Sequence, residues 1–223
     1  MVTDPLLALD TSGAFCSVAL WSDGRVTTEA YAYMSRGQAE ALMPMVADLL
    51  DEAQVAVSDL AAIGVGTGPG NFTGLRIAVA AARGLALGLG RPAIGISAFE
   101  VAAAQAGVGP APALVSLPAP RGAVYLQRFD RGVPDGPAWI AEADAPGDPG
   151  RITEIVGHDA TRIAAALGVA AHRAVVPARP AAWIAALSAK RLHEGGPGPR
   201  PAPMYVRPPD AAPPAHPIPV IRP

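Results

Sequence analysis

Apolar residues in the first hundred positions follow two periods. Short runs at 6–10, 15–21 and 25–32 predict three strands, with the Asp23-Gly24 pair as the turn between the second and third. Residues 38–53 then switch to helical spacing, which predicts an amphipathic helix. The apolar residues of that helix are Leu42, Met45, Val46, Leu49 and Leu50.

Two strand–helix units follow. Strands are expected at 61–65 and 92–96, and helices at 73–89 and 97–104, with Ser97 as an N-cap. The order β-β-β-α-β-α-β-α is typical of a ribonuclease-H-like, actin-type lobe. We therefore expect an α/β fold with an actin-like N-terminal lobe over residues 1–105.

The pattern weakens after residue 105. Strands at 113–117 and 123–130 and helices at 162–167 and 181–192 predict a smaller, irregular second lobe over 106–196. Residues 197–223 hold 11 of the 25 prolines. Proline excludes helix and inner strand, so this tail is expected to be partly extended and to pack back in part.

The amino-acid composition and net charge argue against several kinds of function. The chain has 223 residues, 51% of them apolar, and a net charge of -2, which argues against a generally basic nucleic-acid-binding surface but allows RNA contact within a complex. The single cysteine, Cys16, excludes an internal disulfide and fits the cytoplasm. We expect neither a signal peptide nor a membrane span.

A glycine-rich segment invites three hypotheses. Residues 63–76 read I-G-V-G-T-G-P-G-N-F-T-G-L-R. A Walker A loop needs a lysine that this segment lacks, and G-x-G-x-x-G fails because Asn71 follows Gly66 and Gly68 at the third position. Two explanations remain. In the first, the amides of this loop and the N-terminus of the following helix face an anion. In the second, the loop is a turn that only allows the strand and the helix to pack closely.

A second segment, D-T-S-G at 10–13, favours the anion hypothesis. In actin-type folds such a strand–turn–strand wraps phosphates opposite a glycine-rich turn. The alternative is a turn in which Asp10 bonds its own backbone. The candidate phosphate or nucleotide site comprises Asp10, Thr11, Ser12, Gly13, Gly66, Gly68, Gly70, Asn71 and Thr73.

Together these segments resemble the TsaB (YeaZ) family over residues 6–101. The most specific part is G-P-G-N-F-T-G-L-R, and Y-V-R-P-P-D at 205–210 resembles the family's closing motif. The resemblance implies a two-lobed actin-like fold and an accessory subunit for tRNA threonylcarbamoyladenosine synthesis. Such a subunit holds the catalytic paralogue TsaD active, with the ATPase TsaE completing the assembly. It reaches tRNA only through the complex and requires no cofactor, and weak nucleotide binding at a vestigial phosphate site stays open.

The sequence differs from TsaD at the metal site and from the TsaB family in one motif. The metal site of TsaD needs H-x-x-x-H where this chain has Ser97 and Val101, so no metal is expected. The four histidines, His158, His172, His193 and His216, have no ligand spacing. Pro118 and Ala123 replace an Asp and a Glu of the family's D-A-R-R-G-E-V-Y motif, which puts a ligand role there in doubt.

The helix after the glycine loop is apolar nearly all round, interrupted by Arg76 and Arg83. Such a helix is usually buried, and a subunit interface can supply the burial. The resemblance implies pairing with TsaD through this helix and the preceding one, or a homodimer of the isolated chain. The expected interface residues are Leu42, Met43, Met45, Val46, Leu75, Ala78, Val79 and Ala82.

The leading hypothesis is therefore a non-catalytic scaffold, and no catalytic residue is assigned. The alternative is a stand-alone actin-type ATPase or small-molecule kinase. A kinase needs an acid placed as base, and Asp130, Asp144 and Asp159 all lie in loop-like sequence. A peptidase would need a partner for Cys16, and no histidine lies near it in sequence.

Overall fold

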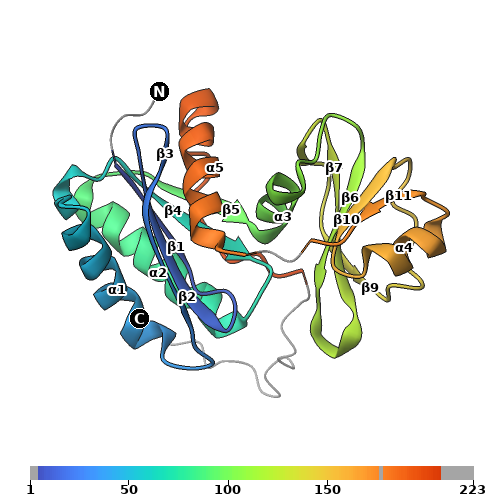
Figure 1. Cartoon of the computed structure of the whole chain (residues 1–223), viewed down its shortest axis with the longest axis horizontal. Coiled ribbons are helices and arrows are strands. Elements are labelled where there is room, and N and C mark those ends of the chain that lie inside the picture. The colour runs from blue at the N-terminus through green and yellow to red at the C-terminus, as the bar shows by residue number, and fades with distance from the viewer. Residues whose placement is uncertain (1–4, 176–177, 207–223) are drawn as a thin grey trace, which may run out of the picture.

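The computed structural model describes residues 5–175 and 178–206, which form two lobes with helix α3 (Ala98–Ala106) between them (Figure 1). The first lobe is built on a five-stranded sheet in the order β3-β2-β1-β4-β5. Its strands are β1 (Leu6–Asp10), β2 (Phe15–Ser22), β3 (Arg25–Tyr33), β4 (Ala62–Gly68) and β5 (Ala93–Ser97). The first three are antiparallel, β4 pairs with β1 in parallel, and β5 pairs with β4 in parallel. The predicted element order of this lobe is confirmed, and so is the actin-like class.

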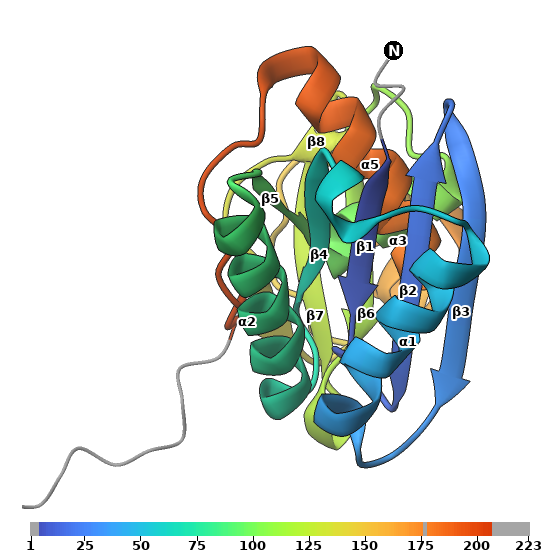
Figure 2. The same cartoon turned by 90° about the vertical axis from the view of Figure 1, so that its left-hand side faces the viewer.

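Side chains alternate between the two faces of this sheet, as a strand period of two requires. Leu7 and Leu9 point to helices α1 (Gln38–Glu52) and α2 (Phe72–Leu89), whereas Leu6 and Ala8 point to helix α5 (Pro180–Gly195). Figure 2 shows α1 and α2 side by side in front of the sheet, with α5 behind it. The sheet is therefore buried on both faces.

Helix α5 corrects the predicted division of the chain. The sequence pattern placed residues 181–192 in the second lobe, 106–196. In the structure, Ala181, Ile184 and Ala185 of α5 are buried against β1, β2 and β4 of the first sheet. Small residues on that face of the sheet, among them Ala8 and Ala62, let the helix approach closely. The second lobe is thus an insertion between α3 and α5.

The predicted interface residues also need a correction. Six of the eight are 0 to 3% exposed because the amphipathic faces of α1 and α2 cover their own sheet, so these side chains offer almost no surface to a partner. The six are Leu42, Val46, Leu75, Ala78, Val79 and Ala82. Met45 is partly buried against the same core, and Met43 is 42% exposed. A partner would have to contact the opposite faces of these helices.

The outer face of α2 is unusually apolar. Exposed residues recur every three or four positions at Phe72, Arg76, Ala80, Gly84 and Leu87, and Thr73 and Gly88 are exposed beside them. By length and composition α2 could cross a membrane, which the sequence analysis did not foresee. Its inner face, however, packs on the first sheet, so the helix is a core helix with an apolar outer face.

The second lobe has a six-stranded sheet, most of whose strands are short, in the order β11-β10-β6-β7-β8, with β9 also paired to β7. Its strands are β6 (Ala113–Pro118), β7 (Val124–Asp130), β8 (Val133–Pro134), β9 (Trp139–Ala141), β10 (Glu154–Gly157) and β11 (Ala171–Arg173). Helix α4 (Ala160–Leu167) covers one face and α3 the other. Two short 3-10 helices, Val57–Asp59 and Pro120–Gly122, complete the elements of the described residues.

The described part of the Pro-rich tail packs back on the first lobe. The Met204 N–H donates to the Thr67 carbonyl at 2.8 Å. Tyr205 meets Phe72 with ring centroids 5.2 Å apart and accepts a 3.0 Å hydrogen bond from Arg76 Nε. The tail thus lines one side of α2, while residues 207–223, with most of the Y-V-R-P-P-D motif, lie outside the described residues.

Two glycines of α2 should respond oppositely to alanine. A Cβ on Gly74 would lie 1.9 Å from the Thr11 carbonyl oxygen, whereas one on Gly84 meets nothing within 4 Å. We expect Gly74→Ala to lower the free energy of unfolding by at least about 2 kcal/mol. The matched Gly84→Ala should raise it by about 0.5–1 kcal/mol, because alanine favours a helix interior. Urea denaturation of both variants checks this, and a Gly74→Ala protein as stable as the wild type would contradict the packing.

Candidate functional site

The D-T-S-G turn and the glycine loop are bonded directly to each other. The buried Thr11 hydroxyl donates to the Gly74 carbonyl at 2.7 Å, and the Asn71 N–H donates to the Ser12 carbonyl at 2.6 Å. Asn71 also caps α2, because its Oδ1 accepts from the Gly74 N–H at 2.9 Å. The two predicted segments therefore meet, as the actin-type pattern implies.

These bonds use donors that a phosphate would need. A phosphate cradle offers unpaired N–H groups at a helix N-terminus. Here the Asn71 and Gly74 amides donate within the protein, and the Ser12 N–H donates to Asp10 Oδ1 at 2.7 Å. The glycine loop thus serves close packing at these positions, and phosphate or nucleotide binding remains a prediction.

A cavity of about 300 Å³ lies beside the turn, where the carboxyl ends of four strands meet. Asp10 ends β1, Gly68 ends β4, Ile96 lies at the end of β5 and Leu117 at the end of β6. Ile184 of α5 closes another side. Ligands of open α/β sheets bind at such strand ends, so this cavity is the candidate site of the fold.

The structure places the predicted site residues in two groups. Those that line the cavity are Asp10, Ser12, Gly13, Gly66, Gly68 and Gly70. Thr11 and Asn71 instead hold the two loops together, and Thr73 lies exposed in the first turn of α2. The sequence analysis missed the apolar walls, which come from Phe15, Ile96, Val101, Leu117 and Ile184. Their separation along the chain left no local pattern to find.

Asp10 is the single ionisable residue among those that line the cavity. A Cβ on Gly66 would lie 2.7 Å from the Asp10 Cγ, so the glycine makes room for the carboxyl group against β4. Burial raises the pKa of Asp10 from 3.8 to about 6, against an opposing effect of the hydrogen bonds from Ser12. Burial also raises the pKa of the neighbouring Cys16 thiol, and the Asp10 carboxylate adds to that rise.

The positions that would hold the metal of TsaD have other roles here. The Ser97 hydroxyl accepts the Glu100 N–H at 3.1 Å and the Glu100 carboxylate accepts the Ser97 N–H at 2.9 Å, a capping box that starts α3. Val101 lines the cavity. Across residues 5–175 and 178–206, no three His, Cys, Asp or Glu side chains gather as metal ligands.

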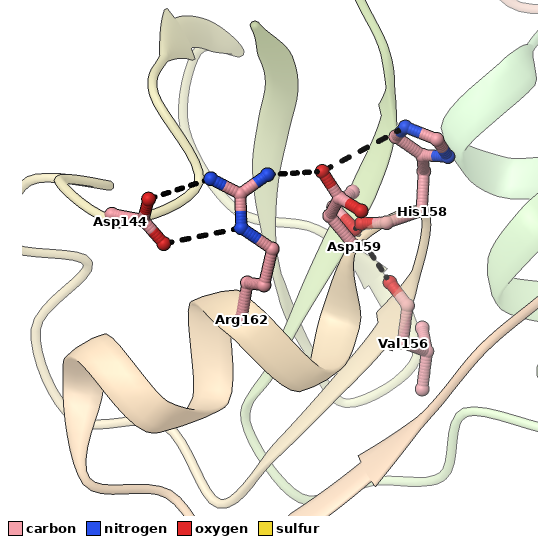
Figure 3. A network of polar contacts seen from close by, with 6 residues as sticks. Asp144, Val156, His158, Asp159 and Arg162 are labelled. Carbon is pink, nitrogen blue, oxygen red and sulfur yellow. Dashed lines mark hydrogen bonds and ion pairs between the residues drawn. The ribbon is translucent and has the colours of Figure 1, made fainter. Parts of the chain in front are cut away.

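The acids considered for a kinase base are all paired. Figure 3 shows Arg162 between Asp144 and Asp159, at 2.6 Å and 3.2 Å, with His158 on the far side of Asp159 at 3.9 Å. The hydrogen bond from Arg162 lowers the pKa of Asp144. Asp130 pairs with Arg131 at 3.5 Å. The two Arg162 pairs stabilise the start of α4, whereas the Asp130 pair lies at the turn after β7. None of the three acids is among the described residues that line the cavity.

The fold and the strand-end cavity define a two-lobed actin-like protein. Ethanolamine utilization protein EutJ of Carboxydothermus hydrogenoformans shares the fold at a TM-score of 0.51 and 13% identity, covering 84% of this chain and 90% of that chain. YeaZ of Pseudomonas aeruginosa is more similar, at a TM-score of 0.67 and 31% identity, covering 91% of this chain and 99% of its own. Residues 32–143, half of the chain, match the family model described as TsaD, tRNA N6-adenosine threonylcarbamoyltransferase.

The protein belongs to the TsaB (YeaZ) family, as its sequence motifs predicted. The tRNA threonylcarbamoyladenosine biosynthesis protein TsaB of Escherichia coli is 40% identical over 70 residues, 31% of this chain and 30% of its own. The match thus spans about a third of the curated TsaB relatives. An uncharacterised protein of Mycobacterium tuberculosis is 35% identical over 211 residues, 93% of this chain and 94% of its own.

The buried carboxyl of Asp10 should leave a pH signature in stability. Its raised pKa means that the folded state binds the proton more tightly than the unfolded state, so stability falls as the pH rises from 3.8 to about 6. The full effect amounts to about 3 kcal/mol, since one pKa unit corresponds to about 1.4 kcal/mol. We expect Asp10→Asn to raise the free energy of unfolding at neutral pH and to remove this slope.

The matched control is Asp48→Asn, which makes the same change on the exposed face of α1. It should alter stability by less than about 0.5 kcal/mol at any pH. Urea denaturation of the three proteins across the acidic range measures the difference. An Asp10→Asn protein less stable than the wild type at neutral pH would show that the carboxylate is a net stabilising group.

Proposed function

We propose that this protein is a non-catalytic subunit in tRNA threonylcarbamoyladenosine synthesis, which binds TsaD and holds it active, with TsaE joining the assembly. The observation that carries the proposal is the outer face of α2. This face is exposed and consists mainly of small and apolar residues, with Arg76 among them. Helices α1 and α2 together cover the side of the first sheet that points away from the second lobe (Figures 1 and 2). TsaB membership supports the pathway, and this face supports the partner role.

The shape of the face suits another helix. Gly84 and Gly88 have open space around them, and Ala80 lies one turn before Gly84. Each glycine costs about 1 kcal/mol in a helix interior, which close approach of a second backbone can offset. Leu87 is 79% exposed, a large apolar side chain that a partner would cover.

A groove of about 480 Å³ runs beside this face, between α2 and the tail. Ala80, Gly84 and Leu87 lie on the α2 side, and Pro203 and Tyr205 lie on the tail side. The groove is also lined by Val79 and by three arginines, Arg76, Arg83 and Arg200. Arg76 lies 3.7 Å above the Phe72 ring and bonds Tyr205, so the tail is held in place at the start of α2. The proposed docking surface is therefore α2 together with the tail. The same surface would serve a homodimer of the isolated chain.

The residues that line the strand-end cavity support a role without catalysis. The cavity at the strand ends has no Lys, Arg or His among its lining residues, whereas phosphoryl transfer relies on cations to stabilise developing charge. Asp130, Asp144 and Asp159, the acids considered as a kinase base, are paired with arginines. These observations disfavour a stand-alone ATPase or kinase.

Two charged substitutions on the outer face test the docking surface. Ala80→Glu and Leu87→Glu place a carboxylate where the proposed contact is apolar, and both sites are exposed, so folding should be preserved. We expect each to weaken TsaD binding at least about 100-fold, or about 3 kcal/mol. Calorimetric titration of TsaD measures the affinity.

Ala166→Glu on the exposed face of α4 is the matched control and should bind TsaD normally. Unchanged affinity of the folded Ala80→Glu and Leu87→Glu proteins would remove the proposed surface. In a reconstituted reaction, the wild type added to TsaD, TsaE and threonylcarbamoyl-adenylate should restore tRNA modification. Rapid ATP hydrolysis by the isolated chain would overturn the scaffold function.

A further inference from the structure

The cavity at the strand ends is not used by the proposed docking function. It measures about 300 Å³, at the lower end for small-molecule sites, and its walls are mostly apolar. Phe15, Ile96, Val101, Leu117 and Ile184 supply carbon surface from both lobes. A ligand of about ten non-hydrogen atoms would fill such a space.

One polar group faces this apolar space. Asp10 is 5% exposed and lines the cavity, yet no arginine, lysine or histidine of the described residues forms an ion pair with it. Its hydrogen-bond donors are the N–H and hydroxyl of Ser12. Burying a carboxylate without a cation is costly, and an incoming cation would recover part of that cost.

The same charge excludes other ligand classes. A phosphate or carboxylate would meet a carboxylate with no lining cation to offset the repulsion. A metal ion would have Asp10 as its one acidic ligand among the described lining residues. Pro118 and Val101, which line the same cavity, have side chains that cannot bind a metal. A protonated amine needs one carboxylate and an apolar surface for its carbon atoms, and both are present.

We propose that this cavity binds a small organic ammonium ion, whose N–H groups donate to the Asp10 carboxylate and whose apolar body packs against Phe15, Ile96 and Ile184. Gly66 is part of the site, because a side chain there would displace the carboxyl group from its position. The ligand would lie between the two lobes, in contact with strand ends of both sheets.

Binding of benzylammonium to the full chain tests the site, with benzyl alcohol as the neutral analogue and benzoate as the anion. We expect benzylammonium to bind with a Kd of about 1 mM or below, about tenfold tighter than the alcohol. Benzoate should not bind. Chemical-shift changes in amide spectra locate the site, and the affected residues should include those around Phe15 and Ile96.

Asp10→Asn should weaken benzylammonium binding at least about tenfold and leave benzyl alcohol unchanged. Asp48→Asn, the exposed control, should bind both as the wild type does. With the pKa of Asp10 at about 6, the wild-type affinity for benzylammonium should fall about tenfold from about pH 7 to about pH 5. The groups that face Asp10 are Ser12 and the Cys16 thiol, and neither gains charge over that range.

The proposal is overturned if about 10 mM benzylammonium gives no saturable shifts at these residues. It is equally overturned if Asp10→Asn binds the amine as tightly as the wild type, or if ADP displaces it from the same residues. None of these measurements involves TsaD, so their failure would leave the proposed scaffold function intact.

Discussion

The hydrogen bond from the Thr11 hydroxyl to the Gly74 carbonyl joins two loops more than sixty residues apart in the chain. It ties the first turn of α2 to the turn that follows β1. It requires glycine at position 74, because any side chain would collide with the Thr11 carbonyl. The same contact fixes the D-T-S-G turn, and with it the position of Asp10. Both proposed surfaces, the outer face of α2 and the strand-end cavity, therefore depend on this one junction.

The junction also explains why a glycine-rich loop need not be a phosphate cradle. Glycines allow a backbone to approach a ligand, but they equally allow it to approach another backbone. Here the Asn71 and Gly74 amides are used within the protein, and the nearby cavity carries a negative charge in place of cations. A loop of nearly the same composition can thus serve packing in one protein and anion binding in another. The two cases differ in whether the N–H groups of the loop donate within the protein or point toward the space where an anion would bind.

The sequence predicted the elements of the first lobe well, because strand and helix periods are local properties of the chain. Six of the eight residues that it assigned to a partner interface are buried in the protein's own core. Periodicity identifies the most apolar face of a helix. In α1 and α2 that face, which includes Leu42 and Ala82, packs on the protein's own sheet. The outward face of α2 is marked by small residues such as Ala80 and Gly84, which carry a weak hydrophobic pattern. The apolar walls of the cavity could not be predicted either, because Ile184 lines the same cavity as Asp10 only through the tertiary fold.

The position of helix α5 in the chain has a consequence for folding during translation. A ribosome makes all five strands of the first sheet within the first 97 residues, but the helix that covers one face of that sheet is residues 180–195. Leu6, Ile94 and Ile96 therefore stay uncovered while the whole inserted lobe is synthesised. The first lobe cannot complete its core during translation before the second lobe has emerged. The nascent protein consequently presents an apolar sheet face until α5, residues 180–195, has been synthesised.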